Sequence, residues 1–150
     1  MKFKLDKTYQ FDLTGQVKFG DIPPDKLYDI FKDGRCASFL LEPQLTYWFE
    51  SLKHITGCKD HDHVDDKGVK YDAKNFTISG GLKFMSSSML GTGRVFQMEI
   101  AHEKANELIY ICCDIVEFPK VNVIFKKGKE LIKEYPNCRI PKSDREFLFG

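Results

Sequence analysis

The sequence predicts a single α/β (α+β) domain in which a central mixed β-sheet is flanked by helices. With 150 residues, the chain is long enough for one domain with a real hydrophobic core and too short for two ordinary domains. Hydrophobic residues make up 42% of the chain and charged residues 30%, which is typical of a protein that folds by itself. Segments with apolar residues at alternate positions are mixed with segments in which they recur every three or four positions, so both strands and helices are expected.

Helical periods occur in three places. A short helix is expected between Pro24, which suits a first turn, and Gly34, which is placed to end it. A longer helix follows, with Pro43 in or just before its first turn, and closes near Gly57. A third, short helix ends before Pro136. The apolar residues that define the three helices are Leu27, Ile30 and Phe31, then Leu45, Trp48, Phe49 and Leu52, then Leu131, Ile132 and Tyr135.

Strand-like alternation covers residues 9–19, 60–77 and 121–125, and residues 108–118 form a β-rich apolar run that also predicts a strand. In the second of these segments, the polar sequence Asp-Asp-Lys-Gly at 65–68 separates two alternating stretches, which predicts a β-hairpin with a glycine-containing turn. Residues 78–96 are rich in Gly and Ser and predict a long loop, and long loops inside a compact domain are usually functional. We therefore expect one domain over residues 1–140 and a C-terminal tail over residues 141–150.

The five cysteines predict a reducing compartment. Their number is odd, no CxxC spacing occurs, and the adjacent pair Cys112 and Cys113 lies in an apolar run where a thiol is inert as a nucleophile. The N-terminus has no apolar signal core, and no apolar stretch approaches the roughly 18 residues of a membrane span. A cytoplasmic protein without membrane contact is expected.

The segment 62–74, DHVDDKGVKYDAK, contains the residues that best predict chemistry. Asp72 and Lys74 are two positions apart in an expected strand, so their side chains project from the same face. Asp62 lies ten positions before Asp72 across the turn, where a hairpin can bring it beside Asp72, and Asp60 competes with it for this place. Two carboxylates held together repel each other without a cation, and Mg²⁺ prefers such oxygen ligands. The sequence thus predicts a magnesium site.

The pattern Asp62…Asp72-Ala73-Lys74 resembles the PD-(D/E)XK nuclease superfamily, which includes many restriction enzymes and Holliday-junction resolvases. The resemblance extends over about residues 34–126 and implies a restriction-endonuclease-like fold. It implies that Asp62, Asp72 and the Ala73 carbonyl bind Mg²⁺, and that Lys74 serves the attacking water. It also implies a helix-borne glutamate before the first aspartate; Glu42 or Glu50 can fill this role, and Glu42 is preferred.

The reaction that follows from the resemblance is hydrolysis of a DNA phosphodiester bond by metal-activated water, in an enzyme of restriction, homing or phage type. The net charge is only +1, but residues 67–94 and 120–133 are locally basic. Hydroxyl and cationic side chains near the expected site are suited to phosphate contacts. The candidate DNA-binding residues are Lys83, Ser86, Ser87, Ser88, Thr92 and Arg94.

Two further patterns suggest other interpretations. His61 and His63 flank Asp62, and with Cys58 they suggest zinc, but their spacing matches no four-ligand zinc pattern. The C-terminal sequence EFLFG resembles the short peptides with which T4-type phage proteins bind the sliding clamp. The candidate partner-binding residues are Phe147, Leu148 and Phe149, and the alternative is that they pack onto the domain.

Two functional hypotheses follow. The first is a Mg²⁺-dependent DNA endonuclease, which needs a homodimer or two sequential nicks to cut both strands because one site handles one strand. The second is a noncatalytic accessory protein that binds DNA or the sliding clamp.

Overall fold

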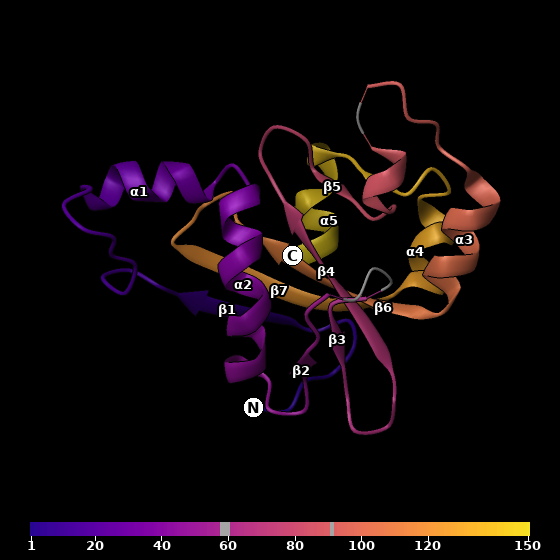
Figure 1. The fold of residues 1–150 in the computed structure, drawn as a ribbon, viewed down its shortest axis with the longest axis horizontal. Coiled ribbons are helices and arrows are strands. Elements are labelled where there is room, and N and C mark those ends of the chain that lie inside the picture. The colour runs from indigo at the N-terminus through magenta and orange to yellow at the C-terminus, as the bar shows by residue number, and fades with distance from the viewer. Residues whose placement is uncertain (58–60, 91) are drawn as a thin grey trace.

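The computed structural model describes residues 1–57, 61–90 and 92–150, with Ser87 described by its backbone only. Five helices and eight strands occur within these ranges (Figure 1). The helices are α1 (Pro24–Phe31), α2 (Arg35–Trp48), α3 (Met98–Asn106), α4 (Gly128–Glu134) and α5 (Arg145–Phe149), and two short 3-10 turns are η1 (Ser87–Met89) and η2 (Lys142–Asp144). The strands are β1 (Thr8–Asp12), β2 (Lys53–His54), β3 (His63–Val64), β4 (Lys70–Phe76), β5 (Leu82–Lys83), β6 (Leu108–Asp114), β7 (Lys120–Lys127) and β8 (Arg139–Ile140).

Six of the described strands form one curled, mixed sheet in the order β1-β7-β6-β4-β3-β2. Strands β4 and β6 are parallel, with Asp72 opposite Tyr110, and the other neighbours in this sheet are antiparallel. Strands β5 and β8 form a separate two-stranded sheet. The predicted mixed α+β class with a central sheet is therefore confirmed.

One face of the sheet packs against α1 and α2. Both helices bury one apolar side, and these sides meet residues that alternate along β6 and β7. Aromatic rings fill much of this core: Phe49 lies edge-on to Phe125 with ring centroids 5.0 Å apart, and Phe31 stacks on Phe118 at 4.7 Å. The buried helix residues are Leu27 and Phe31 of α1 and Ala37, Leu41 and Leu45 of α2.

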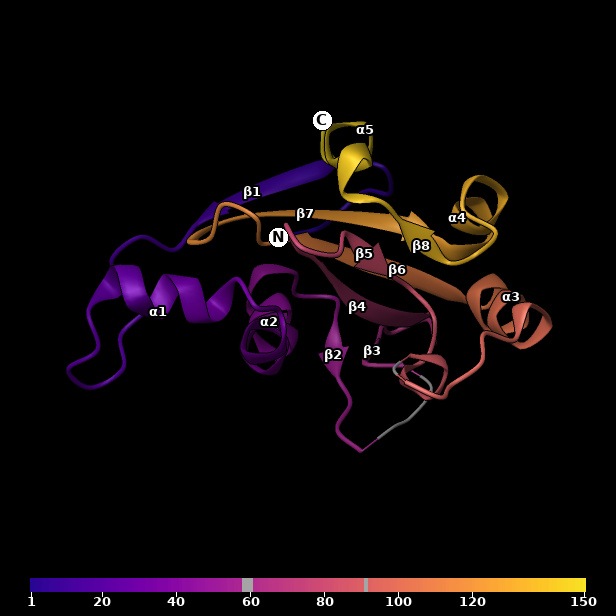
Figure 2. The same ribbon diagram turned by 90° about the horizontal axis from the view of Figure 1, so that it is seen from above.

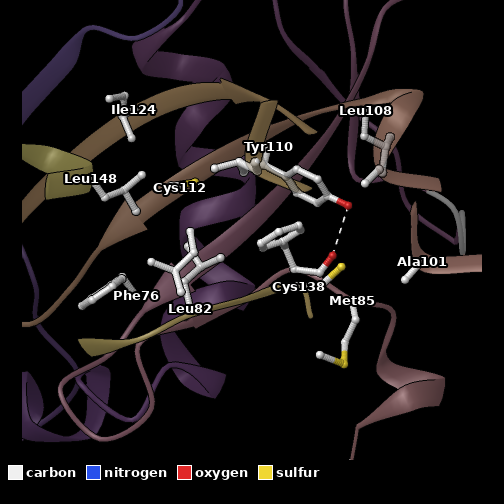
Figure 3. Close-up of a cluster of buried hydrophobic side chains, with 14 of the residues drawn as sticks. Phe76, Leu82, Met85, Ala101, Leu108, Tyr110, Cys112, Ile124, Cys138 and Leu148 are labelled. Atoms are coloured by element: carbon white, nitrogen blue, oxygen red, sulfur yellow. Dashed lines mark hydrogen bonds between the residues drawn. The ribbon is translucent and has the colours of Figure 1, made fainter. Parts of the chain in front are cut away.

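The opposite face packs against α3, α4 and α5, so that the sheet lies between two layers of helices (Figure 2). Figure 3 shows the core on this face, where the Tyr110 hydroxyl donates a hydrogen bond to the Phe84 carbonyl at 3.1 Å. Residues of the expected long loop, including Leu82, Phe84, Met85 and Met89, are buried in this core. The segment 78–96 is therefore anchored to the domain at several points along its described length.

The predicted hairpin is present as β3 and β4, which pair antiparallel with His63 opposite Tyr71. The Asp65 carboxylate holds the turn by accepting hydrogen bonds from the backbone N–H groups of Lys67 and Val69, at 2.9 and 3.0 Å. Gly68 has a φ of +79°, a conformation that is easy for glycine and strained for residues with a Cβ. The hairpin prediction thus holds for both its strands and its turn.

The expected boundaries of the longer helix were wrong. Helix α2 begins at Arg35 and ends at Trp48, so Pro43 lies in its interior and the helix stops well before Gly57. Phe49 adopts an extended backbone with φ −124° and ψ 100°, yet its side chain is buried, so apolar spacing continued past the end of the helix. Helix α3 was not expected, because residues 98–106 show no clear apolar period.

Cys36, Cys112, Cys113 and Cys138 are free thiols, and Cys58 lies outside the described residues. Cys112 and Cys113 are fully buried, as expected, and burial raises the pKa of Cys112 to about 12. At neutral pH this thiol is therefore protonated and unreactive. None of the helices in the described ranges is both long and apolar enough to cross a bilayer.

The expected tail, residues 141–150, is packed against the sheet instead of extending from the domain. Leu148 and Phe149 are 5% and 7% exposed, and Phe149 contacts Phe76 edge-on with ring centroids 5.7 Å apart. The Arg145 guanidinium lies 2.9 Å from the buried carboxylate of Asp114, and the Thr8 hydroxyl donates to the Phe149 carbonyl at 2.8 Å. These contacts make α5 part of the domain.

The packing of α5 predicts that the tail contributes to stability. Leu148→Ala should lower the free energy of unfolding by about 2–4 kcal/mol, because it removes a buried side chain and leaves a cavity. Phe147→Ala is the matched control, since Phe147 is 70% exposed in the same helix and its loss should change stability by less than about 0.5 kcal/mol. Urea unfolding measures both. Equal, small effects of the two variants would show that α5 does not pack in solution.

Candidate active site

The predicted site residues meet at the outer edge of β4. Strand β3 pairs with β4 only at Lys70 and Tyr71, so β4 continues alone on this side from Asp72 onward within the described chain. Asp62, which immediately precedes β3, occupies this edge: its backbone N–H donates to the Tyr71 carbonyl at 2.9 Å, and its Oδ2 accepts the Ala73 N–H at 3.0 Å.

The carboxyl group of Asp62 lies close enough to that of Asp72 for the two to interact when Asp62 is protonated. Burial, the contact with Asp72 and the nearby charges of Asp72 and Glu42 together raise the pKa of Asp62 to about 7, although the Ala73 N–H acts in the opposite direction. Asp72 itself is only 6% exposed. The Asp62 carboxyl is therefore costly to ionise beside Asp72 while no cation is present.

Lys74 lies on the same face of β4 as Asp72, as the spacing of the two residues predicts. Its Nζ is 3.2 Å from the Asp72 Oδ2, and both side chains are largely shielded from solvent. The ammonium is thus positioned beside the carboxyl pair. It is close enough to act on a water molecule held there.

Glu42 approaches the carboxyl pair from α2. Its negative charge contributes to the raised pKa of Asp62, which places it near that carboxyl, and its Oε2 lies 3.3 Å from the Nε2 of His54. Glu50, the other helix glutamate that was considered, follows the end of α2 and is exposed. The structure therefore brings Glu42, and not Glu50, to the edge of β4.

His63 is buried on the same side of the hairpin as α2. Its Nε2 lies 2.7 Å from the Glu42 carbonyl, whereas its Nδ1 has no hydrogen-bond partner in the described residues. Burial lowers the pKa of His63, so the ring is neutral at pH 7 and donates its Nε2–H to that carbonyl. His63 thereby connects β3 to α2 and helps to fix Glu42 relative to Asp62. This contact explains the buried position of His63 without a metal ligand role.

The side chains at this site suit some metal ions better than others. Within residues 1–57, 61–90 and 92–150, no group of three or more His, Cys, Asp or Glu side chains could by itself hold a metal ion. This does not favour zinc, which takes three or four such ligands. Mg²⁺ often uses one or two carboxylates and completes its shell with other oxygens and water. Asp62, Asp72 and the Ala73 carbonyl fit this pattern, because the carbonyl of a strand residue faces the same edge as its N–H.

The candidate DNA-binding residues follow β4 in the chain. Lys83 is exposed on β5, and Thr92 and Arg94 are exposed before α3. The hydroxyls of Ser86 and Ser88 are 2.7 Å apart around η1, which Figure 2 shows on the side of the molecule where β3 lies. The side chain of Ser87, as well as Asp60, Cys58 and Gly91, lies outside what the structure describes. The phosphate contacts of these residues therefore stay predictions.

The three residues expected to bind a partner differ in how far they are exposed. Leu148 and Phe149 are buried in the domain core, where no partner can reach them while α5 is packed, and Phe147 alone of the three is exposed. A docking peptide must be accessible along its apolar residues. Contact with a sliding clamp through all three residues would therefore require α5 to detach from the sheet.

His54 is the residue near the site that sequence reasoning did not assign. It lies on β2, a strand of only two residues, which is too short to show alternation. Its ring lies 5.2 Å, centroid to centroid, from that of His63, and it contacts the Glu42 carboxylate. A histidine twelve residues after a helix glutamate carries no recognisable spacing, so only the fold could identify this contact.

No family model, curated protein or solved structure matches the chain. The site is therefore interpreted from its geometry and its sequence pattern alone.

The raised pKa of Asp62 predicts a pH-dependent stability. In the metal-free protein, Asp62 keeps a proton between about pH 4 and 7 that the unfolded chain has lost. Its contribution therefore lowers stability as pH rises through this window, by about 2 kcal/mol for a partly buried carboxyl. Urea unfolding at pH 5 and pH 8 with EDTA should show a decline in wild type relative to Asp62→Asn.

The comparison with Asp62→Asn is needed because His63 makes the protein more stable as pH rises, whereas Asp62 makes it less stable. The lowered pKa of His63 means that its burial becomes less costly as pH rises past the ordinary histidine value of about 6.5. Both proteins contain His63, so its contribution cancels in the difference between them. Asp66→Asn, which removes an exposed carboxylate of the turn, should behave like wild type. Parallel pH profiles of wild type and Asp62→Asn would contradict the raised pKa of Asp62.

Proposed function

We propose that this protein is a Mg²⁺-dependent deoxyribonuclease that hydrolyses phosphodiester bonds. The observation that carries the proposal is the convergence of Asp62 and Asp72 beside the Lys74 ammonium, at an edge of β4 that no described strand covers. The Asp62 carboxyl is costly to ionise beside Asp72, and a divalent cation would remove that cost by replacing the proton of Asp62.

Asp62, Asp72 and the Ala73 carbonyl would hold the metal, which supplies a positive charge that activates water and stabilises the leaving oxygen. Asp62 can offer one oxygen to a cation while its Oδ2 keeps the Ala73 N–H. Asp72 can offer one oxygen while its Oδ2 keeps Lys74. Each aspartate therefore retains a second oxygen that could bind a cation.

Lys74 is proposed to hold the attacking water and to take part in its deprotonation. Its position 3.2 Å from Asp72 allows it to act on a water that reaches the carboxyl pair. Glu42 adds a third negative charge, from the side of α2, and His54 holds its carboxylate at 3.3 Å. This charge is proposed to strengthen cation binding or to orient a metal-bound water.

The resemblance to the PD-(D/E)XK superfamily is supported by where its elements lie. Helix α2 with Glu42, the β3–β4 hairpin with Asp62, Asp72 and Lys74, and β6 parallel to β4 all occur within residues 34–126, over which the resemblance extends. The restriction-endonuclease-like fold, the DNA substrate and the family membership are proposals that rest on this arrangement. The exposed cations Lys83 and Arg94 are the proposed phosphate contacts.

The proposal predicts Mg²⁺-dependent cleavage of DNA. Purified protein should convert supercoiled plasmid to nicked or linear forms with Mg²⁺ and not with EDTA. Asp72→Asn and Lys74→Ala should each reduce the rate at least 100-fold, because the first removes a ligand charge and the second the group that serves the water. Asp66→Asn and Lys70→Ala, exposed neighbours in the same hairpin, should cleave at the wild-type rate.

The outcomes of this assay separate the functional classes. Cleavage that persists in both Asp72→Asn and Lys74→Ala would locate the chemistry elsewhere in the chain. No cleavage of supercoiled, branched or single-stranded DNA by a folded wild-type protein would reject the nuclease and favour a noncatalytic accessory protein. Sequencing the ends produced from genomic DNA would then distinguish a sequence-specific enzyme from one that selects a DNA structure.

A second prediction concerns the helix glutamate. Glu42→Gln should reduce cleavage at least tenfold and raise the Mg²⁺ concentration needed for half-maximal rate, because the glutamate charge lies near Asp62. Glu50→Gln should change neither quantity, since Glu50 is exposed beyond the end of α2. A Mg²⁺ titration of the cleavage rate measures both variants. Equal behaviour of the two would remove Glu42 from the site.

A further inference from the structure

Two histidines on neighbouring strands contact the same glutamate. His54 of β2 lies directly opposite His63 of β3 in the antiparallel ladder, so both side chains project from one face of these strands. Strand β2 lies beside α2, which carries Glu42 (Figure 1). The Nε2 of His54 is 3.3 Å from the Glu42 carboxylate, and the Nε2 of His63 is 2.7 Å from the Glu42 carbonyl. The side chain and the main chain of one glutamate are therefore held by one pair of strands.

The direction of these hydrogen bonds follows from their acceptors. A carbonyl and an ionised carboxylate can only accept, so each histidine donates its Nε2–H to Glu42. The side chains of His54 and Glu42 are 24% and 28% exposed, so their contact is partly shielded from water. A hydrogen bond from His54 to a charged acceptor in this environment is strong enough to restrict the glutamate side chain.

The same two strands also fix Asp62. The Ile55 N–H donates to the Asp62 carbonyl at 2.8 Å, and Asp62 immediately precedes β3. Ile55 follows His54, and His63 follows Asp62, so two adjacent positions on each strand hold the two acidic residues. The pairing of β2 with β3 thus determines where Glu42 lies relative to Asp62.

Glu42 needs such a contact because its surroundings repel it. Its negative charge lies near Asp62 and acts on that carboxyl. Like charges repel, and a glutamate side chain with several rotatable bonds can turn toward water unless a donor holds it. We propose that His54 is a positioning residue of the candidate active site. It holds the Glu42 carboxylate near Asp62, while His63 holds the Glu42 main chain, and it thereby strengthens the binding of a divalent cation.

This inference rests on the proposed function, and it predicts how large the effect of His54 is. Residues that orient the groups around a metal typically contribute about 10–100-fold to its affinity. His54 is partly exposed, so the lower end of this range, about tenfold, is expected. Because His54 acts through the Glu42 carboxylate, its effect should disappear when Glu42 is replaced.

Mn²⁺ binding tests the proposal without DNA. Mn²⁺ prefers the same oxygen ligands as Mg²⁺, and electron paramagnetic resonance measures its free concentration. Wild type should bind Mn²⁺, and Asp72→Asn should lose this binding. His54→Phe, which keeps an aromatic ring but no donor, should bind about tenfold more weakly. His54→Gln, whose amide N–H can replace the ring N–H, should bind within about threefold of wild type. Lys53→Met is the matched control, because the Lys53 side chain is 70% exposed on the same strand.

A double-mutant cycle distinguishes positioning from a purely structural role. Glu42→Gln should weaken Mn²⁺ binding, and adding His54→Phe to it should cause no further loss. If His54 only supported the fold, His54→Phe would lower stability in urea but leave the affinity unchanged, or its effect would add fully to that of Glu42→Gln. Urea unfolding with EDTA verifies that each variant is folded, and His54→Leu is used if His54→Phe is not.

The outcomes separate this proposal from the nuclease itself. A folded wild type that binds no Mn²⁺ would overturn both. Binding that requires Asp72 but is unchanged in His54→Phe, or effects of His54 and Glu42 that add fully, would overturn the role of His54 alone. Binding that depends on His54 in a protein that cleaves no DNA would support the role of His54 and reject the nuclease.

Discussion

From Asp72 onward, the outer edge of β4 has no neighbouring strand in the described chain, and the side chain of Asp62 takes the place of one. Its Oδ2 accepts the Ala73 N–H that a longer β3 would have bound. Strand β4 is otherwise held firmly, because β6 pairs with it in parallel along its whole length. The arrangement therefore places a carboxyl where backbone pairing ends, beside Asp72, and the raised pKa of Asp62 is the electrostatic consequence.

The parallel pairing of β4 with β6 also determines what surrounds the site. A parallel pair needs a crossover connection, and residues 77–107 provide it through β5, η1 and α3. Leu82, Phe84 and Met89 anchor this connection in the core, while Lys83 and Arg94 stay exposed. The same chain segment thus closes one face of the sheet and carries the proposed phosphate contacts. Its Gly and Ser content allows tight turns between the anchored residues.

The local features of this arrangement could be predicted from the sequence. Asp72 and Lys74 share a face because strand alternation requires it, and the hairpin follows from Asp65 and Gly68 in the turn. Contacts between elements far apart in the sequence could not be predicted in the same way. The choice between Glu42 and Glu50 depends on where α2 begins and ends, and Phe49 continued the helical spacing after the helix had stopped. His54 and α5 were missed because two-residue strands and short terminal helices show little period, so only packing defines them.

Asp62 combines two roles that substitution cannot fully separate. Its Oδ2 supports the edge of β4 through the Ala73 N–H, and its carboxyl also interacts with Asp72. Replacing Asp62 by alanine would remove a proposed metal ligand and also leave a backbone donor without its acceptor, so a loss of activity would have two causes. Lys74 and Asp72 do not support the open edge of β4 in this way, because the parallel ladder to β6 runs on the other side of the strand. They are therefore the residues whose substitution reports on chemistry rather than on the hairpin.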